Sequence, residues 1–289
     1  RYLPMRLKHI KQHFIFHSTY YRYSTNPFAI NITTVHDFTY EYFSSGLRKK
    51  IHCWQKYRAI KKSQYIICIS ENTRKDLLYF LPDIPLDKIK VIYNGVSDDY
   101  YPVDKWNGGI LPFKKCDYLL FVGAREGYKN FDFIVKALKK SEYKLVIVGA
   151  DLLDDEIRML DENLINRYFY MGRLSNSDLN NLYNGAYALI YPSSYEGFGI
   201  PVLEAQKAGC PVIAYNASSI PEIIGDTTLL MNNLVTNELL DKLSILKDKK
   251  VRKEIIRKGY KNAQKYSWDK SFEELIKVYE EAERLLIEN

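Results

Sequence analysis

The chain has 289 residues, of which 46% are hydrophobic and 27% are charged, and its formal net charge is +7. This size and composition are typical of a globular protein with two domains, and no apolar run approaches the roughly 20 residues that a membrane span needs. The four cysteines lack the CxxC spacing of a zinc site, so the sequence predicts free thiols, a cytoplasmic location and no bound metal.

The first hundred residues carry the pattern of a doubly wound α/β domain, but an incomplete one. Apolar runs predict strands at 14–16, 31–35, 65–69 and 90–92, and helices are predicted at 46–62 and 71–80, the latter capped by Ser70. Such a domain usually takes about 150 residues. We therefore expect a truncated N-terminal domain over residues 1–102, with an uncovered edge on its sheet.

The predicted helix 46–62 is strongly basic. Its face is either simply solvated or a surface for peripheral contact with an anionic membrane, at the inner face of the membrane. No recognised DNA or RNA module accompanies it, so no nucleic-acid partner is expected. Its seven basic residues are Arg48, Lys49, Lys50, Lys56, Arg58, Lys61 and Lys62.

Turn signals between Asn94 and Pro112 mark the domain boundary, and Asn107-Gly-Gly109 is among them. Beyond it, strands alternate with helices up to about residue 267, which predicts a parallel sheet covered on both faces. The predicted strands lie at 118–122, 144–148, 167–170, 188–191 and 211–214, and the helices at 130–140, 154–163, 175–186 and 201–208. The organisation is then 1–102, 103–267 and a terminal helix at 268–289.

The terminal helix, predicted over 268–287, is amphipathic. Its expected apolar side consists of Phe272, Leu275, Ile276, Tyr279, Leu285 and Leu286.

Two acids, Glu196 and Glu204, flank the point where a predicted strand passes through a glycine-bearing loop into a helix that opens at Pro201. Open α/β sheets bind phosphorylated ligands at such strand ends and helix N-termini. An isolated pair of acids at this spacing is more often two surface residues. In this context we expect both carboxylates to bind hydroxyl groups, because an acid repels a phosphate.

Two further strand ends carry candidate residues. Arg125 and Lys129 follow the strand at 118–122, where two cations suit a diphosphate, although a polar loop with exposed bases is an equal alternative. His36 ends the strand at 31–35 on the edge that faces the ligand crevice in such sheets, and a structural role is equally open. Neither the dinucleotide GxGxxG nor the P-loop pattern is present.

Several ordered motifs together resemble retaining glycosyltransferases of family 4, which have two Rossmann-like domains facing a cleft (the GT-B architecture). The block from Tyr191 to Glu204, with Glu-Gly-Phe-Gly at its centre, is the most specific. One departure is Ala124, where many members place an arginine, and the glycine-rich loop of the family is not found before Phe14. The motifs span residues 34–37, 67–71, 91–96, 122–130, 191–205 and 221–226.

The resemblance implies a retaining, metal-independent transfer from a nucleotide-sugar to a glycan or lipid-linked acceptor, in bacterial surface polysaccharide synthesis. It implies no cofactor, and it implies that the terminal helix at 268–289 crosses back to the N-terminal domain. Its implied catalytic residues are His36, Glu196, Arg125 and Lys129. Its implied donor-binding residues are Glu204 at the ribose, Gly197, Phe198 and Gly199 through their backbone, and Arg173 with Leu174 at the base.

Other functions remain open on the sequence. A non-catalytic homologue that only binds a nucleotide-sugar is the main alternative. An epimerase of the same architecture is disfavoured by the Glu-Gly-Phe-Gly loop, and a nicotinamide-dependent oxidoreductase by the missing GxGxxG. The sequence does not identify the sugar, the base or the acceptor.

Overall fold

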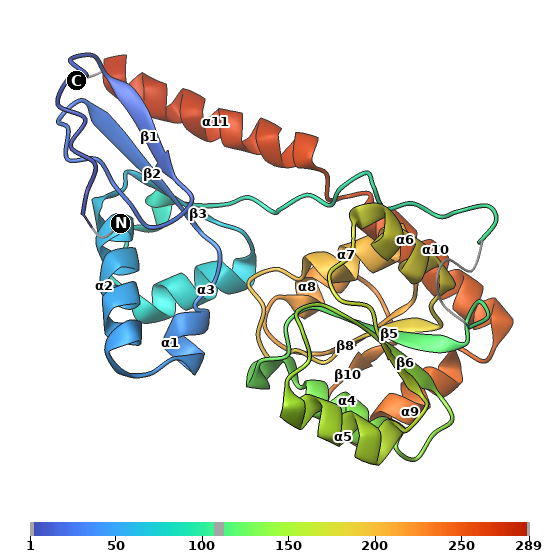
Figure 1. The fold of residues 1–289 in the computed structure, drawn as a ribbon. Helices are drawn as coiled ribbons and strands as arrows, with labels where there is room; N and C mark the ends of the chain where they lie inside the picture. The colour runs from blue at the N-terminus through green and yellow to red at the C-terminus, as the bar shows by residue number, and fades with distance from the viewer. Residues whose placement is uncertain (1–2, 107–112, 288–289) are drawn as a thin grey trace. The chain divides into compact units, whose positions relative to one another are not determined.

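A computed structural model describes residues 3–106 and 113–287 of the chain, without the side chains of residues 285–287 (Figure 1). The chain divides into two compact units. Unit 1 ends its first segment at Gly95 and also includes the segment that begins at Trp268, and unit 2 is Val96–Ser267. The boundary between the units therefore lies between Gly95 and Val96, whereas the sequence predicted it after residue 102. The expected turn residues Asn107, Gly108, Gly109 and Pro112 lie outside the described residues.

Unit 1 is built on a four-stranded parallel sheet in the order β1-β2-β3-β4. The four predicted strands and two predicted helices are confirmed, and the Ser70 hydroxyl accepts the Thr73 N–H as the expected cap. The strands are β1 (Phe14–Ser18), β2 (Ala29–Val35), β3 (Tyr65–Cys68) and β4 (Ile89–Val91). The helices are α1 (Thr39–Phe43), α2 (Gly46–Lys62), α3 (Glu71–Phe80), the short η1 (Leu86–Lys88) and α11 (Trp268–Ile287).

Helix α11 covers one face of the unit 1 sheet (Figure 1). Its Val278 and Ala282 are buried against Ile30, Ile32 and neighbouring strand residues. The expected apolar side is therefore only partly correct. Leu275 and Tyr279 pack against this cluster, whereas Phe272 is 61% exposed. The side chains of Leu285 and Leu286 lie outside the described part of the chain.

The basic face predicted for α2 is wrong at Lys56. This side chain is fully buried and forms a 2.7 Å ion pair with Glu41, which is also buried. Its ammonium group also donates to the Asp37 carbonyl and lies 4.2 Å from the centre of the Phe38 ring. Lys49 is half-buried and donates to the Glu41 carbonyl. The sequence of a helix shows which residues are charged, but not whether one of the cations pairs with an acid inside the core.

Unit 2 is built on a six-stranded parallel sheet in the order β10-β9-β8-β5-β6-β7. The α/β fold class predicted from the alternation is thus confirmed, and Ser175 caps α6 by accepting the Asp178 N–H. The strands are β5 (Tyr118–Val122), β6 (Lys144–Val148), β7 (Tyr168–Tyr170), β8 (Ala188–Tyr191), β9 (Val212–Tyr215) and β10 (Leu230–Met231). The helices are η2 (Gly127–Lys129), α4 (Phe131–Leu138), α5 (Asp154–Leu164), α6 (Asn176–Gly185), α7 (Ile200–Lys207), α8 (Ile220–Ile224), α9 (Thr236–Ile245) and α10 (Lys249–Ala263).

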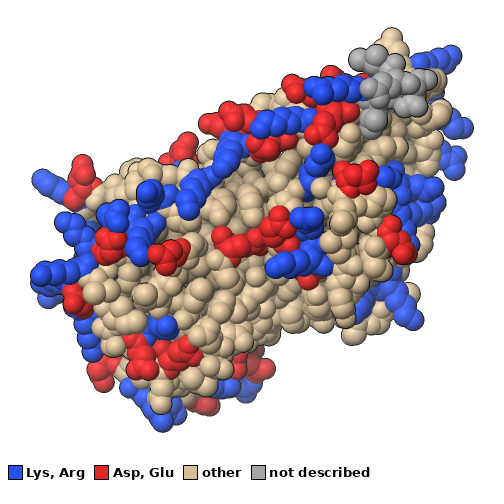
Figure 2. Space-filling model, turned by 180° about the vertical axis from the view of Figure 1, so that it is seen from behind, with Lys and Arg blue, Asp and Glu red and all other residues tan. Residues whose placement is uncertain are grey.

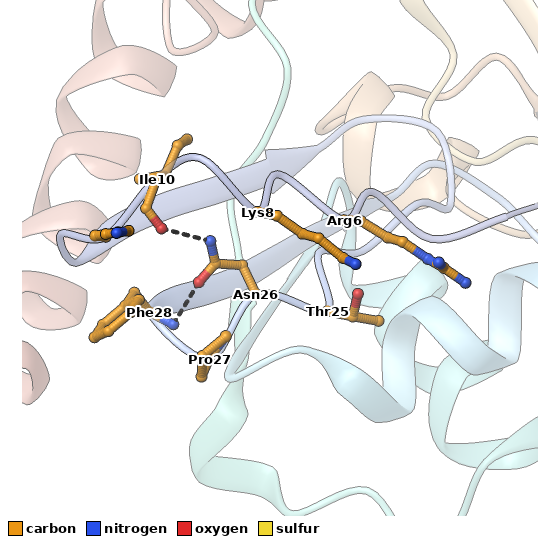
Figure 3. Close-up of a pocket in the computed structure, with 8 residues that line it drawn as sticks. Arg6, Lys8, Ile10, Thr25, Asn26, Pro27 and Phe28 are labelled. Carbon is orange, nitrogen blue, oxygen red and sulfur yellow. Dashed lines mark hydrogen bonds between the residues drawn. The ribbon is translucent and has the colours of Figure 1, made fainter.

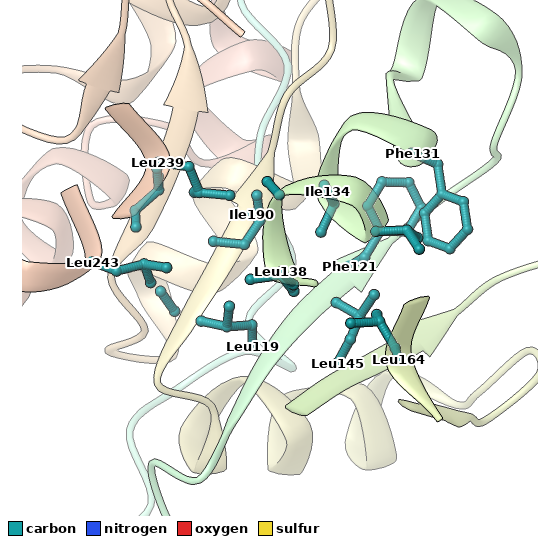
Figure 4. Close-up of a cluster of buried hydrophobic side chains, with 14 of the residues drawn as sticks. Leu119, Phe121, Phe131, Ile134, Leu138, Leu145, Leu164, Ile190, Leu239 and Leu243 are labelled. Atoms are coloured by element: carbon teal, nitrogen blue, oxygen red, sulfur yellow. The ribbon is translucent and has the colours of Figure 1, made fainter. Parts of the chain in front are cut away.

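A large apolar cluster fills the space between one face of this sheet and helices α4, α5 and α9 (Figure 4). Leu119 and Phe121 of β5 point into it, with Ile134 and Leu138 of α4 opposite. The alternate residue Tyr118 points to the other face, where its hydroxyl donates to the Leu182 carbonyl of α6. This alternation explains why both faces of the strand read as apolar in the sequence.

Strand order places a switch point beside β5. The chain leaves β5 toward β6 on one side, and later returns to add β8 on the other side. At such a point, the loops at the carboxyl ends of the two central strands diverge and leave room for a ligand. The loops after β5 and β8 are those that contain Lys129 and Glu196.

Candidate active site

The two switch-point loops are tied together by Asn130. Its side-chain amide donates to the Pro192 carbonyl at 2.8 Å and to the Ser194 hydroxyl at 2.7 Å. The backbone adds a bond from the Ser194 N–H to the Tyr128 carbonyl at 2.8 Å. Asn130 has a left-handed backbone (φ 51°), which asparagine tolerates better than most residues. These contacts hold the loop of Lys129 against the loop of Glu196.

Lys129 and Glu196 form an ion pair at this junction. Lys129 Nζ lies 2.6 Å from Glu196 Oε1, and their side chains are 16% and 12% exposed. The Tyr191 hydroxyl also hydrogen-bonds Glu196, and burial first, then the charge of Glu196, raises the pKa of Tyr191 well above its usual range. The carboxylate is therefore oriented by a cation and a neutral phenol.

Two serines hold the Glu-Gly-Phe-Gly loop through hydrogen bonds to its backbone. The Ser218 hydroxyl accepts the Glu196 N–H at 2.7 Å, and the buried Ser219 hydroxyl donates to the Phe198 carbonyl at 2.8 Å. Phe198 is 3% exposed. Gly199 has φ 109°, and a side chain there would meet Ile220, so only glycine fits at the start of α7. The loop is thus a rigid support for Glu196.

Glu204 lies about one turn inside α7 and is mostly buried. The Tyr183 hydroxyl donates to Glu204 Oε2 at 3.0 Å, and Tyr100 hydrogen-bonds the same carboxyl group. Desolvation raises the pKa of Glu204, although both tyrosines act in the opposite direction. Neither tyrosine was predicted, because the chain has 25 tyrosines and nothing in their local sequence distinguishes these two.

The structure does not bring Arg125 to Lys129. Its side chain is 5% exposed, and Nε lies 2.9 Å from Glu156 Oε1. Its Nη2 donates to the carbonyls of Ala150 and Asp151. Nη1 is buried without a hydrogen-bond partner in the part of the chain that is described. Arg125 thus links the loop after β5 to the loop after β6.

Those two loops cross at very close range. A side-chain carbon on Gly149 would lie 2.4 Å from the Gly123 carbonyl oxygen, and Gly149 has φ 153°. Both glycines end their strands, as expected for close backbone packing beside a ligand site. Next along this edge come Arg173, which is exposed, and Leu174, which is half-buried. Burial raises the pKa of Tyr170, and the positive charges of Arg125 and Arg173 both lower it.

His36 belongs to unit 1 and follows β2. Its Nε2 lies 3.2 Å from the Thr19 carbonyl. The neighbouring strand β1 contributes His17, which hydrogen-bonds Thr34 at 2.8 Å and Tyr279 of α11 at 2.6 Å. Burial, followed by the charge of His36, lowers the pKa of His17. His36 therefore lies at the carboxyl edge of the unit 1 sheet, where the sequence placed it.

A basic pocket lies at the opposite, amino-terminal edge of that sheet (Figure 3). Arg6, Lys8 and Lys11 line it, together with residues 25–28 ahead of β2. The side chain of Asn26 supports its wall by donating to the carbonyls of Leu7 and Ile10. The pocket therefore lies at the opposite edge of the sheet from His36.

Surface charge, metal ligands and helix length add three observations. On the face drawn in Figure 2, acidic and basic side chains are interspersed. Within residues 3–106 and 113–287, no group of three or more His, Cys, Asp or Glu side chains is arranged to hold a metal ion. No helix in the same residues is long and apolar enough to cross a membrane.

Comparison with known proteins agrees with this fold. Residues 104–262 match the family described as Glycosyl transferases group 1, and residues 2–100 match Glycosyltransferase Family 4. The first match covers more than half of the chain. The chain belongs to the family of glycosyl transferases group 1.

Individual relatives are more distant. The chain is 27% identical to O-antigen chain mannosyltransferase B of Escherichia coli, over 86% of this chain and 69% of that protein. It is 30% identical to O-antigen chain mannosyltransferase RfbU of Salmonella typhimurium, over 72% of this chain and 58% of that protein. Among solved structures, Anabaena HepE in complex with UDP-glucose superposes with a TM-score of 0.73 at 17% identity, covering 88% of this chain and 72% of HepE.

Proposed function

We propose that the chain transfers a glycosyl group from a nucleotide-sugar donor to a glycan or lipid-linked acceptor, with retention of the anomeric configuration. The observation that carries this proposal is the Lys129–Glu196 pair at the switch point of the unit 2 sheet. It joins a cation suited to a diphosphate with a carboxylate suited to a sugar hydroxyl. Membership of the family supports the reaction class.

Lys129 is proposed to stabilise the leaving group. The bond between the anomeric carbon and the diphosphate oxygen breaks, and its electron pair stays on the diphosphate, where the ammonium group offsets the charge. The acceptor hydroxyl forms the new bond on the same face of the sugar. Its proton passes to the departing diphosphate oxygen, so the step needs no protein nucleophile.

The two carboxylates are proposed to bind hydroxyl groups. Glu196 orients the donor sugar, supported by Ser218 and Tyr191. The backbone N–H groups of the Gly197–Gly199 loop and the start of α7 face the same ligand. Glu204, held by Tyr183, binds the ribose.

Three further assignments are part of the proposal. Nη1 of Arg125 is buried without a hydrogen-bond partner in the described residues, so its two N–H groups remain as donors for a phosphate. Arg173 and Leu174, on the same sheet edge, receive the base. His36 is assigned to the donor sugar. No metal or cofactor takes part in the proposed step, because Lys129 and the α7 N-terminus supply the positive potential.

The transferred sugar is proposed to be mannose, within surface polysaccharide synthesis on the cytoplasmic side of the membrane. The relatives in Escherichia coli and Salmonella typhimurium are both named O-antigen chain mannosyltransferases. At 27% and 30% identity, their names support a sugar class.

The test uses radiolabelled UDP-, GDP- and ADP-sugars, including the mannose derivatives, with octyl α-mannoside as acceptor. We expect transfer from one mannose donor and a product of unchanged anomeric configuration by NMR. Lys129→Ala should lower kcat/KM by about 10²–10³, the usual cost of losing one transition-state contact. Lys136→Ala is the matched control, because this lysine is 65% exposed on α4. Donor binding without turnover would favour the non-catalytic alternative.

Helix α2 supports a second element of the proposal, contact with an anionic membrane surface. Leu47, Ile51 and Trp54 are 72%, 38% and 51% exposed, and their spacing places them on one stripe of the helix. The helix contains no acidic residue. The bases that remain exposed on it are Arg48, Lys50, Arg58, Lys61 and Lys62. A stripe of apolar groups flanked by cations is typical of helices that lie in a membrane interface.

Vesicle co-sedimentation tests the membrane contact. We expect binding to vesicles with 30% phosphatidylglycerol, weakening with salt, and little binding to pure phosphatidylcholine. Trp54→Ala and Leu47→Ala should weaken it, whereas Tyr79→Ala, at an exposed aromatic on α3, should not. Equal binding by all three variants contradicts a role for this stripe.

A further inference from the structure

Three asparagines on α6 form a ladder that holds an extended segment of unit 2. Asn176, Asn180 and Asn184 are four residues apart, so they lie on one face of the helix. Asn180 Oδ1 accepts the Tyr101 N–H at 3.1 Å, and Asn184 Oδ1 accepts the Val103 N–H at 2.8 Å. Asn184 Nδ2 also donates to the Tyr101 carbonyl at 2.9 Å.

The ladder forms the backbone hydrogen bonds that a neighbouring strand would otherwise form. A carboxamide offers a donor and an acceptor, as a peptide group does, so successive asparagines satisfy the extended backbone as a strand would. Asn176 completes it by donating to Asp99 Oδ2 at 2.7 Å. These contacts fix the backbone on both sides of Tyr100.

Tyr100 is thereby placed beside Tyr183 and Glu204. Its side chain is buried, and its ring meets that of Tyr183 edge to face, with centroids 5.8 Å apart. Its hydroxyl hydrogen has two acceptors, Asn176 Oδ1 at 3.3 Å and the Glu204 carboxyl group. Since the hydroxyl has one hydrogen, an ionised Glu204 is the stronger acceptor of the two.

We propose that Tyr100 is a positioning residue for the ribose-binding carboxylate. Together with Tyr183 it holds the Glu204 oxygens in one orientation, and the asparagine ladder keeps Tyr100 in reach. This inference rests on the proposed function, because it assigns Glu204 to the hydroxyl groups of the donor ribose. It predicts that a phenol outside the loops after β5 and β8 controls how well ribose is recognised.

The test is calorimetric titration with UDP, GDP and ADP and with their 2′,3′-dideoxy counterparts. For the ribonucleotide that binds the unaltered chain, Tyr100→Phe should weaken binding roughly tenfold, as expected for one hydrogen bond to a buried charged group. For the dideoxy counterpart the change should stay below about twofold, because no hydroxyl reaches Glu204. Tyr101→Phe is the matched control, since that side chain is 55% exposed and the ladder uses only its backbone.

A second variant keeps the test decisive if Tyr100→Phe fails to fold. Asn184→Ala removes two ladder contacts without touching Tyr100, and should give a smaller loss with the same dependence on the ribose hydroxyls. Equal losses for ribonucleotide and dideoxynucleotide indicate general loosening and overturn the inference, as does unchanged binding by Tyr100→Phe. If no nucleotide binds the unaltered chain, the proposed function fails and this inference fails with it.

Discussion

Lys129 Nζ and Glu196 Oε1 lie 2.6 Å apart, although 67 residues separate them in the chain. The pair joins the two loops that diverge at the switch point of the unit 2 sheet. While they are paired, each group neutralises the other. A diphosphate must therefore compete with Glu196 for the lysine, and a sugar hydroxyl must compete with Lys129 for the carboxylate.

This competition predicts that Glu196→Gln moves binding and catalysis in opposite directions. Removing the carboxylate frees Lys129, so a nucleoside diphosphate should bind about fivefold more tightly, equivalent to about 1 kcal/mol for a partly exposed ion pair. Transfer should nevertheless fall by about 10²–10³, because the sugar loses its orienting group. Calorimetry and initial-rate kinetics measure the two effects. Asp132→Asn, which breaks the exposed pair with Lys136, should change neither. Weaker nucleotide binding by Glu196→Gln would contradict the competition.

Glu204 predicts a pH-dependent cost in stability. Burial raises its pKa, so between the ordinary pKa and the raised one the folded chain holds a proton that the unfolded chain has lost. The free energy of unfolding therefore falls as pH rises through this window. Glu204→Gln should match the unaltered chain below the ordinary pKa of glutamate and exceed it above the window, while donor binding declines.

Urea unfolding at a series of pH values measures the effect. Glu254→Gln is the control of opposite sign, because a hydrogen bond from Arg257 lowers the pKa of Glu254. Its contribution is present above the ordinary pKa and lost as pH falls, so this variant should show no gain at high pH. A Glu204→Gln variant that is less stable at high pH would show that the charged carboxylate is not strained by burial.

The crossing of Gly123 and Gly149 predicts a sharp difference between two glycines in neighbouring loops. Gly149→Ala brings a carbon within 2.4 Å of a backbone oxygen at φ 153°, and should cost roughly 1–3 kcal/mol or more. Gly127 has open space around the same position, so Gly127→Ala should be close to neutral. Thermal unfolding compares them, with about 2–4 °C expected per kcal/mol. Similar melting temperatures would show that the loops separate at no cost.

The buried pair of Lys56 and Glu41 predicts non-additive effects in unit 1. Lys56→Met leaves an uncompensated buried carboxylate and should cost about 3–5 kcal/mol. Adding Glu41→Gln should recover much of this loss, because no buried charge remains. Denaturant unfolding of the two single variants and the double variant gives the coupling, and Lys62→Met, at an exposed position, serves as control. Additive losses would mean that the two groups do not depend on each other.

The strands and most of the site loops were predictable because their signals are local. Apolar runs ending in glycine located β5 and β6, the apolar run at 188–191 located β8, and the glycines around Phe198 marked the loop of Glu196. Short elements such as β10 and α8 carry too few residues for a periodic pattern and were missed. The longer helices α9 and α10 were missed as well.

Contacts between distant residues could not be predicted. Nothing near Arg125 indicates that Glu156 binds it, and the burial of Lys56 depends on Glu41 and Phe38 of another helix region. On α11, the spacing of apolar residues did not decide whether the side of Phe272 or the side of Val278 faces the sheet. In the structure, Val278 packs against the sheet. The fourfold spacing of Asn176, Asn180 and Asn184 was a readable signal, but its partner segment carries no matching pattern.

Helix α11 has a consequence for how the chain is made. Unit 1 needs Val278 and Ala282 to cover Ile30 and Ile32, yet the ribosome adds α11 after every residue of unit 2. During synthesis, unit 2 is complete while the earlier sheet still lacks its cover. The exposed isoleucines are then a transient site for chaperones or aggregation, which ends only when the helix docks.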